Sequence, residues 1–224
     1  MSRVRDATIL AVLLTALIIQ SAWSGSVFQP PGIASAANIT YPTNVMTPGI
    51  VTLMVNLDSS GNVQNLDVLR DHPPLTSVAS AAVKSWSFRP ASLDGQAVPS
   101  VLPVTVVFNP VNPGGVGNLS QTISLSQTTP AATAGYNPPQ ITVASYATYP
   151  VASIASGAVV LDVTIGTTGK VAKVHVVRDV QSLTQQAAKA VKAWTFAPAA
   201  YQETPIASHM IVAFVFPSPG TGSF

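Results

Sequence analysis

The chain has 224 residues, of which 47% are hydrophobic and only 8% are charged, and its formal net charge is +2. Soluble proteins carry about 25% charged residues, so the surface must consist largely of uncharged polar and small apolar side chains. The ten basic residues form no cluster, which argues against nucleic-acid binding through neutralised phosphates. Because cysteine is absent, a disulfide framework, a zinc–thiolate site and a cysteine nucleophile are excluded.

The N-terminus combines two arginines with an apolar run over residues 7–19, and small residues follow where a signal peptidase requires them. The run has about the length of a signal-peptide core and is shorter than the roughly 20 residues that span a bilayer. Residues 1–24 are therefore predicted to be a cleaved signal peptide. The other reading is an uncleaved membrane anchor over residues 7–23. Both readings make the rest of the chain exported.

An internal duplication fills most of the remaining sequence. Residues 41–108 align with residues 149–216 without a gap, and about 25 of the 68 columns are identical. This predicts two small tandem domains rather than one large domain. The predicted segments are a lead-in at 25–40, a first domain at 41–109, a linker rich in Pro, Gly, Ser, Thr and Gln at 110–148, a second domain at 149–217, and a tail at 218–224.

Each domain begins with two predicted strands. Apolar and polar residues alternate over residues 49–58 and 157–166, which is the period of a half-buried strand. Gly61 or Gly169 then supplies the positive φ that a short hairpin loop needs, and a second strand follows. In both copies the first valine after this glycine is out of phase with the strand, which predicts a β-bulge there.

A helix and a third strand complete each domain. Apolar residues at i, i+4, i+7, i+8 and i+11 over residues 75–86 and 183–194 predict an amphipathic helix. Pro90 or Pro198 ends it, and "LPVTVVF" or "MIVAFVF" reads as a closing strand. The predicted fold class is α+β, with two tandem β-β-α-β domains. Each domain has a three-stranded, mainly antiparallel sheet with one helix packed on one face.

The sequence offers little catalytic or metal-binding chemistry. His72, His175 and His209 do not stand at equivalent positions of the two copies, and no i, i+4 pair suits a metal. Asp71 and Asp179 do recur, each behind an arginine, where such a pair either anchors a ligand carboxylate or braces a turn. A nucleophile elbow, a Walker loop and a dinucleotide fingerprint are all absent from the sequence. We therefore predict a non-enzymatic protein without cofactor or metal.

The phrase Val-Lys-x-Trp-x-Phe-x-Pro-Ala occurs twice, 108 positions apart. An aromatic pair leaving a helix can line a ligand groove, but the simpler interpretation is that the Trp completes the apolar stripe of the helix. The phrase is then a duplicated structural corner. The residues expected to shape the two domains are Tyr41, Pro42, Gly61, Trp86, Phe88 and Pro90, and Tyr149, Pro150, Gly169, Trp194, Phe196 and Pro198.

These motifs together resemble the TonB C-terminal domain. Tyr-Pro, the alternating strand with its Asp-x-x-Gly-x-Val hairpin, the Trp-x-Phe-x-Pro-Ala corner and a closing Val-x-Val-x-Phe strand occur in order, over roughly 140 of the 224 residues. The first copy keeps Asp58 in the hairpin, whereas the second has Gly166. The resemblance implies a periplasm-facing envelope protein of a Gram-negative-type bacterium. It further implies binding of envelope proteins, with outer-membrane transporters as candidates, by addition of a partner strand to the sheet.

Strand addition needs an open edge, and the third strand of each domain is the predicted edge because Pro103 cannot donate to a ladder at its position. The other readings of this strand are pairing between the two domains and pairing between two chains in a homodimer. The candidate partner-binding residues are Val104, Val106, Phe108, Val212, Phe214 and Phe216.

Two functions remain open at this stage. The first is an exported binding module with two TonB C-terminal-like domains. The second is an inner-membrane-anchored, TonB-type energy transducer that drives transport through outer-membrane receptors. The apolar segment lacks the His and Ser that the family's anchor uses to couple to its motor, and the lead-in, fully extended, reaches only about 55 Å. A secreted hydrolase, the third class, would require a catalytic set that the sequence does not offer.

Overall fold

The computed structural model describes residues 27–43, 45, 47–110, 123–124, 135–150 and 153–218. The predicted signal peptide or anchor lies outside the described residues, as does most of the predicted linker. Within the ranges that are described, none of the helices has the length and apolar character needed to cross a membrane.

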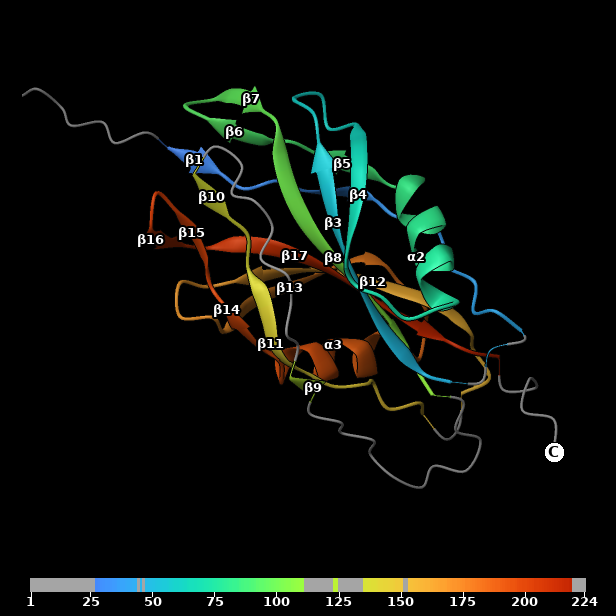
Figure 1. The fold of residues 1–224 in the computed structure, drawn as a ribbon. Coiled ribbons are helices and arrows are strands. Elements are labelled where there is room, and N and C mark those ends of the chain that lie inside the picture. The colour runs from blue at the N-terminus through green and yellow to red at the C-terminus, as the bar shows by residue number, and fades with distance from the viewer. Residues whose placement is uncertain are drawn as a thin grey trace, which may run out of the picture.

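A single six-stranded sheet forms the centre of the molecule (Figure 1). Its strand order is β13-β12-β17-β8-β3-β4, and every neighbouring pair is antiparallel except β8 and β17, which are parallel. The strands are β3 (Gly49–Leu57), β4 (Val63–Arg70), β8 (Ser100–Phe108), β12 (Gly157–Ile165), β13 (Val171–Arg178) and β17 (Ser208–Phe216). Each half is a three-stranded antiparallel sheet, as predicted, and the two halves join into one sheet.

The helices α2 (Leu75–Lys84) and α3 (Thr184–Lys192) cover opposite faces of this sheet. Leu75, Ala79 and Val83 of α2 pack in one core with alternate residues of β3 and β8 and with the far face of β12 and β17. The second core combines α3 with the other face of β12 and β17. One half is therefore turned over relative to the other, and the central strands are covered on both sides. The predicted α+β class, with one helix per half, is confirmed.

The predicted edge position of the third strand is wrong. β8 pairs with β3 and with β17, and β17 pairs with β12 and with β8. Pro103 is tolerated because the β17 ladder begins only at Val104. The six candidate residues, Val104, Val106, Phe108, Val212, Phe214 and Phe216, are at most 1% exposed. Pairing between the two halves, the other reading of these residues, is the arrangement seen.

Each half also has an N-terminal arm that the sequence analysis assigned to lead-in or linker. In the first half β2 (Gly32–Ser35) pairs with β5 (Ser87–Arg89), and β1 (Phe28–Gln29) pairs with the hairpin of β6 (Ala91–Leu93) and β7 (Gln96–Val98). The second half repeats this arrangement with β10 (Tyr136–Asn137), β11 (Gln140–Ala144), β14 (Thr195–Ala197), β15 (Ala199–Tyr201) and β16 (Thr204–Ile206). The short strand β9 (Ile123–Ser124) pairs with β11. We call residues 28–109 unit 1 and residues 136–217 unit 2.

The hairpin between the first two strands of each unit is held tightly against the corner that follows the helix. Gly61 has φ +85° and Gly169 has φ +75°. A methyl group on these residues would lie 2.5 Å and 2.0 Å from the carbonyl oxygens of Phe88 and Phe196, so only glycine suits both positions. The predicted bulge is confirmed by a register shift beside Leu57 in unit 1 and beside Ile165 in unit 2.

Candidate functional site

The duplicated tryptophans lie in the core, where they fasten each arm to its unit. Trp86 is 5% exposed and Trp194 is 2% exposed. The Nε1 of Trp86 donates to the carbonyl of Ala37 at 3.2 Å, and that of Trp194 donates to the carbonyl of Ser145 at 3.1 Å. Phe88 and Phe196, two residues further on, are also buried and belong to the short strands that pair with the arms. Pro90 and Pro198 follow these strands.

The Tyr-Pro motifs pack on the ends of the central strands. The rings of Tyr41 and Phe108 meet edge to face with centroids 5.5 Å apart, and those of Tyr149 and Phe216 are 6.0 Å apart. The Tyr149 hydroxyl donates to the carbonyl of Ala155 at 2.6 Å. Burial raises the pKa of Tyr41 to about 12, with a smaller contribution from nearby Tyr146. Beside them, Pro42 and Pro150 accept backbone hydrogen bonds from Val45 and Ser153.

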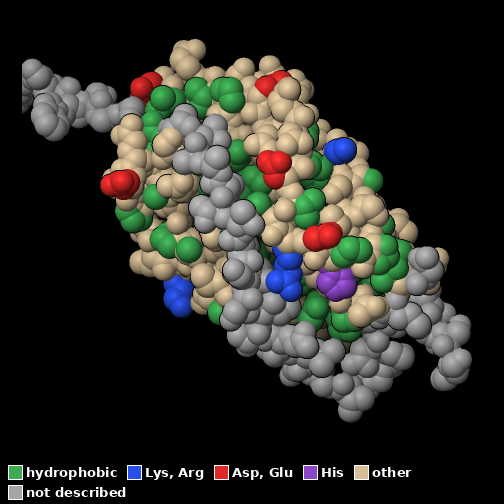
Figure 2. Space-filling model, in the orientation of Figure 1, with side chains coloured by type: hydrophobic (Ala, Val, Ile, Leu, Met, Phe, Trp, Pro, Cys, Tyr) green, Lys and Arg blue, Asp and Glu red, His purple; other side chains and the backbone are tan. Residues whose placement is uncertain are grey.

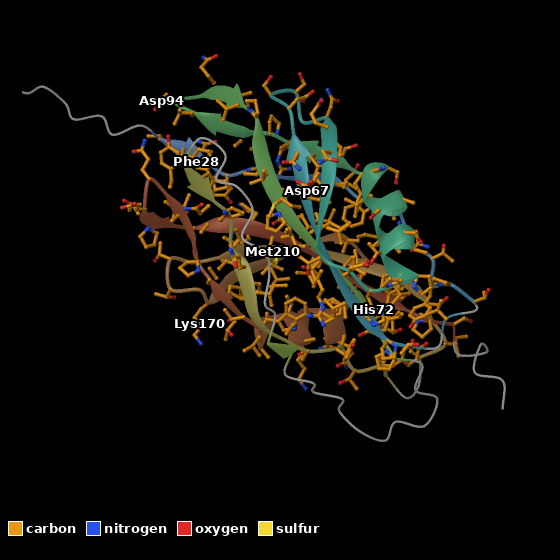
Figure 3. All side chains as sticks on the ribbon, viewed as in Figure 1. Phe28, Asp67, His72, Asp94, Lys170 and Met210 are labelled. Carbon is orange, nitrogen blue, oxygen red and sulfur yellow. The ribbon has the colours of Figure 1, made fainter. Side chains whose placement is uncertain are left out.

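The three histidines do not gather into a site. His209 Nδ1 and Asp162 Oδ1 lie 2.7 Å apart in a hydrogen bond, and the two side chains are 32% and 7% exposed. His175 stands opposite Asp162 in the β12–β13 ladder, whereas His72 lies in unit 1 beside Gly49 (Figure 3). Across the described ranges, no group of three or more metal-ligating side chains could hold an ion.

The recurring Arg-Asp pairs make different contacts in the two units. Arg70 Nε donates to the carbonyl of Ile50 at 3.1 Å. Asp71 and Asp179 are exposed. In unit 2 the Nε of Arg178 is buried and lacks a hydrogen-bond partner within the described part of the chain. The two arginines are therefore not equivalent in their contacts.

A cavity of about 210 Å³ lies where the two units meet, near the Tyr-Pro motif of unit 1. Its lining is uncharged and includes Tyr41, Pro42, Ser156, Gly157 and Phe216. Asn38 of the unit 1 arm also lines it and accepts a hydrogen bond from the Ala158 amide of unit 2 at 3.0 Å. Its walls carry hydroxyl groups, Ser156 among them, but none of the lining residues is an Asp, Glu, His, Lys or Cys that could activate a hydroxyl.

The two outer strands of the six-stranded sheet, β4 and β13, are more exposed than its four central strands. Among the described residues, nothing pairs with the outer side of β4 or β13. Both edges carry an exposed valine at the same position of the repeat, Val68 at 46% and Val176 at 39%. Register shifts interrupt each edge near both ends, which leaves residues 65–68 and 173–176 as regular strand. Bulges of this kind protect an edge from indiscriminate pairing.

The two edges differ in charge although they are equivalent in the repeat. Residues 58–71 of unit 1 hold three aspartates and one arginine, a net charge of −2, whereas residues 166–179 of unit 2 hold two lysines, one arginine and one aspartate, a net charge of +2. Asp58 accepts hydrogen bonds from Ser60, Asn62 and Gln64, and those from Asn62 contribute most to lowering its pKa.

The surface over unit 1 that Figure 2 shows is mostly uncharged, and among its charged side chains the acidic ones are more frequent than the basic ones. In Figure 3, Asp67 lies on β4 and Lys170 at the hairpin of unit 2, on the other side of the molecule. The two edges therefore lie at opposite ends of the six-stranded sheet and carry different charge.

Sequence reasoning missed the arms and misplaced the edges. The arms leave a signal in the sequence, because "FQPPGI" at 28–33 and "YNPPQI" at 136–141 stand at the same 108-residue spacing as the corners. The edges also left a signal. The near-continuous apolar runs of β8 and β17 are typical of strands buried on both faces, whereas β4 and β13 carry the polar residues.

Comparison with known proteins gives one match. A model of the family described as "Gram-negative bacterial TonB protein C-terminal" matches residues 37–110 and 145–217, together more than half of the chain. The chain therefore belongs to the TonB C-terminal domain family and carries the domain in two tandem copies. Both matches begin at the arm residues, Ala37 and Ser145, whose carbonyls bind the tryptophans. Searches of curated proteins and of solved structures each found no matching protein.

Family membership fixes the broad role. The TonB C-terminal family is an envelope family of non-enzymatic protein-interaction domains, which interact with outer-membrane proteins. The chain is therefore assigned an envelope-related role in protein interaction.

Proposed function

We propose that this member of the TonB C-terminal family is an exported, non-enzymatic protein that binds envelope proteins in the periplasm by adding a strand of the partner to its sheet. The family match carries the proposal, and the unpaired outer sides of β4 and β13 within the described residues support it. Strand addition takes its affinity from backbone hydrogen bonds and its specificity from alternate side chains. It therefore suits a chain in which only 8% of the residues are charged.

The proposed binding edges are β4 and β13, in place of the third strands that the sequence favoured. β8 and β17 already use both of their sides in pairing, so a partner strand could enter there only if the two units separated. At the outer edges no described strand occupies the backbone pairing positions. The regular stretches 65–68 and 173–176 set the length of the added strand at about four residues.

Site-specific photo-crosslinking in living cells tests this proposal. A photoreactive residue replaces Val68 or Val176 on the edges, and the matched control replaces Ile154, which is apolar and 90% exposed but lies on no strand. We expect the two edge positions to crosslink to extended segments of envelope proteins, outer-membrane transporters among them. Equal crosslinking from position 154, or crosslinks only to cytoplasmic proteins, would contradict the proposal.

A second candidate is an energy transducer anchored in the inner membrane, which the apolar run over residues 7–19 favours. The proposed export signal and the anchor occupy the same segment and predict different products. Intact mass spectrometry of the protein from fractionated envelopes separates them. A soluble periplasmic product without residues 1–24 supports the exported binding protein. A full-length product in the membrane fraction supports the transducer.

A further inference from the structure

Each outer edge presents two apolar residues on the face of the sheet that its own helix covers. Val174 of β13 packs into the core under α3, and Leu66 of β4 packs into the core under α2. Because side chains alternate along a strand, Val176 and Val68 point to the same sides as these residues. Each edge therefore offers two neighbouring apolar positions to an added strand, one buried in part and one exposed.

On the face away from its own helix, each edge carries different residues. β13 presents Lys173 and His175, which stand opposite Thr164 and Asp162 in the ladder. β4 presents Asn65 and Asp67 at the equivalent positions, opposite Asn56 and Met54. Asp67 accepts hydrogen bonds of 2.7 Å from the side-chain amides of both Asn56 and Asn65. The unit 2 edge is thus basic where the unit 1 edge is acidic and already hydrogen-bonded.

Neighbouring charges strengthen this contrast. The turn before β13 carries Lys170 where unit 1 has Asn62, and Gly166 stands in place of Asp58. On α3, exposed Lys189 replaces Ala81 of α2. All of these exchanges make the unit 2 side more positive. Asp162, which stands opposite His175 in the ladder, is buried and hydrogen-bonded to His209, so it does not offset the charge of the exposed lysines.

We propose that the β13 edge of unit 2 selects extended segments in which acidic and apolar residues alternate, and that the β4 edge of unit 1 rejects them. The proposal rests on the strand-addition function above and names the chemistry of its partner. Acidic residues of the added strand face Lys173 and His175, and its apolar residues extend the surface of Val174 and Val176. Opposite charges on directly neighbouring strands stabilise pairing, and like charges weaken it.

Fluorescence anisotropy with the full chain and synthetic peptides tests the proposal. The probe is a labelled peptide in which Asp and Val alternate, and its controls replace Asp by Ser or by Lys. At low ionic strength we expect the Asp peptide to bind about fivefold more tightly than the Ser peptide, which corresponds to one exposed charge pair of about 1 kcal/mol. Added salt should reduce this preference because it screens exposed charges.

The duplication supplies a matched control variant. Lys173→Glu should abolish the preference for the Asp peptide, whereas Asn65→Glu, the same position on the other edge, should leave its affinity unchanged within about twofold. Both residues are exposed, so both variants are expected to fold, and circular dichroism checks this. An equal effect of the two variants, or equal affinity for the Asp and Ser peptides, overturns the proposal.

Two further outcomes separate this proposal from the function on which it rests. If an Asp–Val peptide with methylated backbone amides binds as well as the unmodified one, binding is by charge alone and strand addition itself fails. If the Ser peptide binds as tightly as the Asp peptide and methylation abolishes both, strand addition stands and charge selection fails. Salt-sensitive self-association that Lys173→Glu removes would instead make the acidic edge of a second copy the occupant, and this would overturn the peptide proposal.

Discussion

Trp86 and Trp194 bind carbonyls at the same position of their arms, 49 residues before each of them. Asn65 and Lys173 are just as equivalent in the repeat, yet they differ in charge and lie on the exposed edges. After duplication, a buried position is constrained by packing on all sides, whereas an exposed edge residue changes at little cost in stability. The cores therefore keep the two units folded and joined, whereas the edge residues are free to diverge.

The largest effect is expected from replacing either of the two equivalent tryptophans. We expect Trp86→Ala and Trp194→Ala each to lower the free energy of unfolding by about 3–5 kcal/mol, because each leaves a cavity and an unpaired carbonyl. Trp194→Ala should cost at least as much, since Trp194 also packs against Phe196 and Phe214 at ring-centroid distances of 6.3 and 5.7 Å. Urea unfolding measures both. A cost below about 1 kcal/mol for either variant would show that the corner does not anchor its arm.

The arms differ at Phe28 and Tyr136, and alkaline pH exposes this difference. Burial raises the pKa of Tyr136 to about 12, against the effect of its hydrogen bond with Ser208. The folded state therefore keeps a proton that the unfolded state loses. The contribution of the Tyr136 proton to the free energy of unfolding is fully present below about pH 10, and it disappears as the pH rises toward 12. The loss across this window is about 2–3 kcal/mol for Tyr136.

Tyr136→Phe, which copies the unit 1 residue, measures that contribution. We expect the variant to lose about 1 kcal/mol at pH 7 because Ser208 loses its partner, and to decline less steeply than the parent between pH 10 and 12. Urea midpoints across this range give both quantities. Parallel pH profiles for parent and variant would contradict the prediction. The remaining decline of the variant is assigned to Tyr41 and Tyr146, whose pKa values burial also raises.

The units could be predicted from sequence because their signals are local. Alternation over residues 49–58, the helical stripe that ends at Trp86 and the glycine at position 61 each depend on a few neighbouring residues. They correctly indicated the strand β3, the helix α2 and the hairpin turn. β3 is nevertheless buried on both faces rather than half-buried, because unit 2 residues pack against its other face, and α2 ends at Lys84, before Trp86 and Pro90. The arms could not be read in this way, since two-residue strands such as β1 show no period. Only the second copy of the Pro-Pro segment reveals them.

The edges could not be predicted because they depend on how the two units meet. Pro103 is a valid local sign of an unpaired backbone position, and the β17 ladder does begin one residue later. Which strand ends at solvent is decided by the β8–β17 pairing, a contact between residues more than 100 positions apart. Charge along β4 and β13 was visible in the sequence, but its meaning depends on this placement.

Unit 2 has the polar pair Asp162 and His209 where unit 1 has the apolar residues Met54 and Val101. We expect His209→Val to cost about 1–2 kcal/mol, because it leaves a buried carboxylate without its partner. This is less than for a fully buried pair since the His209 side chain is 32% exposed. Asp162→Met should cost less, because the remaining histidine reaches solvent.

The double variant, Asp162→Met with His209→Val, transplants the unit 1 pair into unit 2. It should be more stable than His209→Val alone, because no buried charge remains. Urea unfolding of the two single variants and the double variant gives the coupling energy. Costs that simply add would show that the two side chains do not stabilise one another.

The smallest expected effect concerns the reverse exchange, at Thr52 and Thr105 of unit 1. Their hydroxyl oxygens lie 3.3 Å apart and both residues are fully buried, whereas unit 2 has Val160 and Ala213 at these positions. Thr52→Val should cost about 1 kcal/mol because the Thr105 hydroxyl is left unpaired, and Thr52→Val with Thr105→Val should be close to neutral because both partners become apolar. Equal or additive costs in urea unfolding would mean that each hydroxyl is stabilised separately. If the double variant regains the stability of the parent, the two units form equally stable cores with different residue pairs. Either member of the Thr52–Thr105 pair could then change without cost only if the other changed with it.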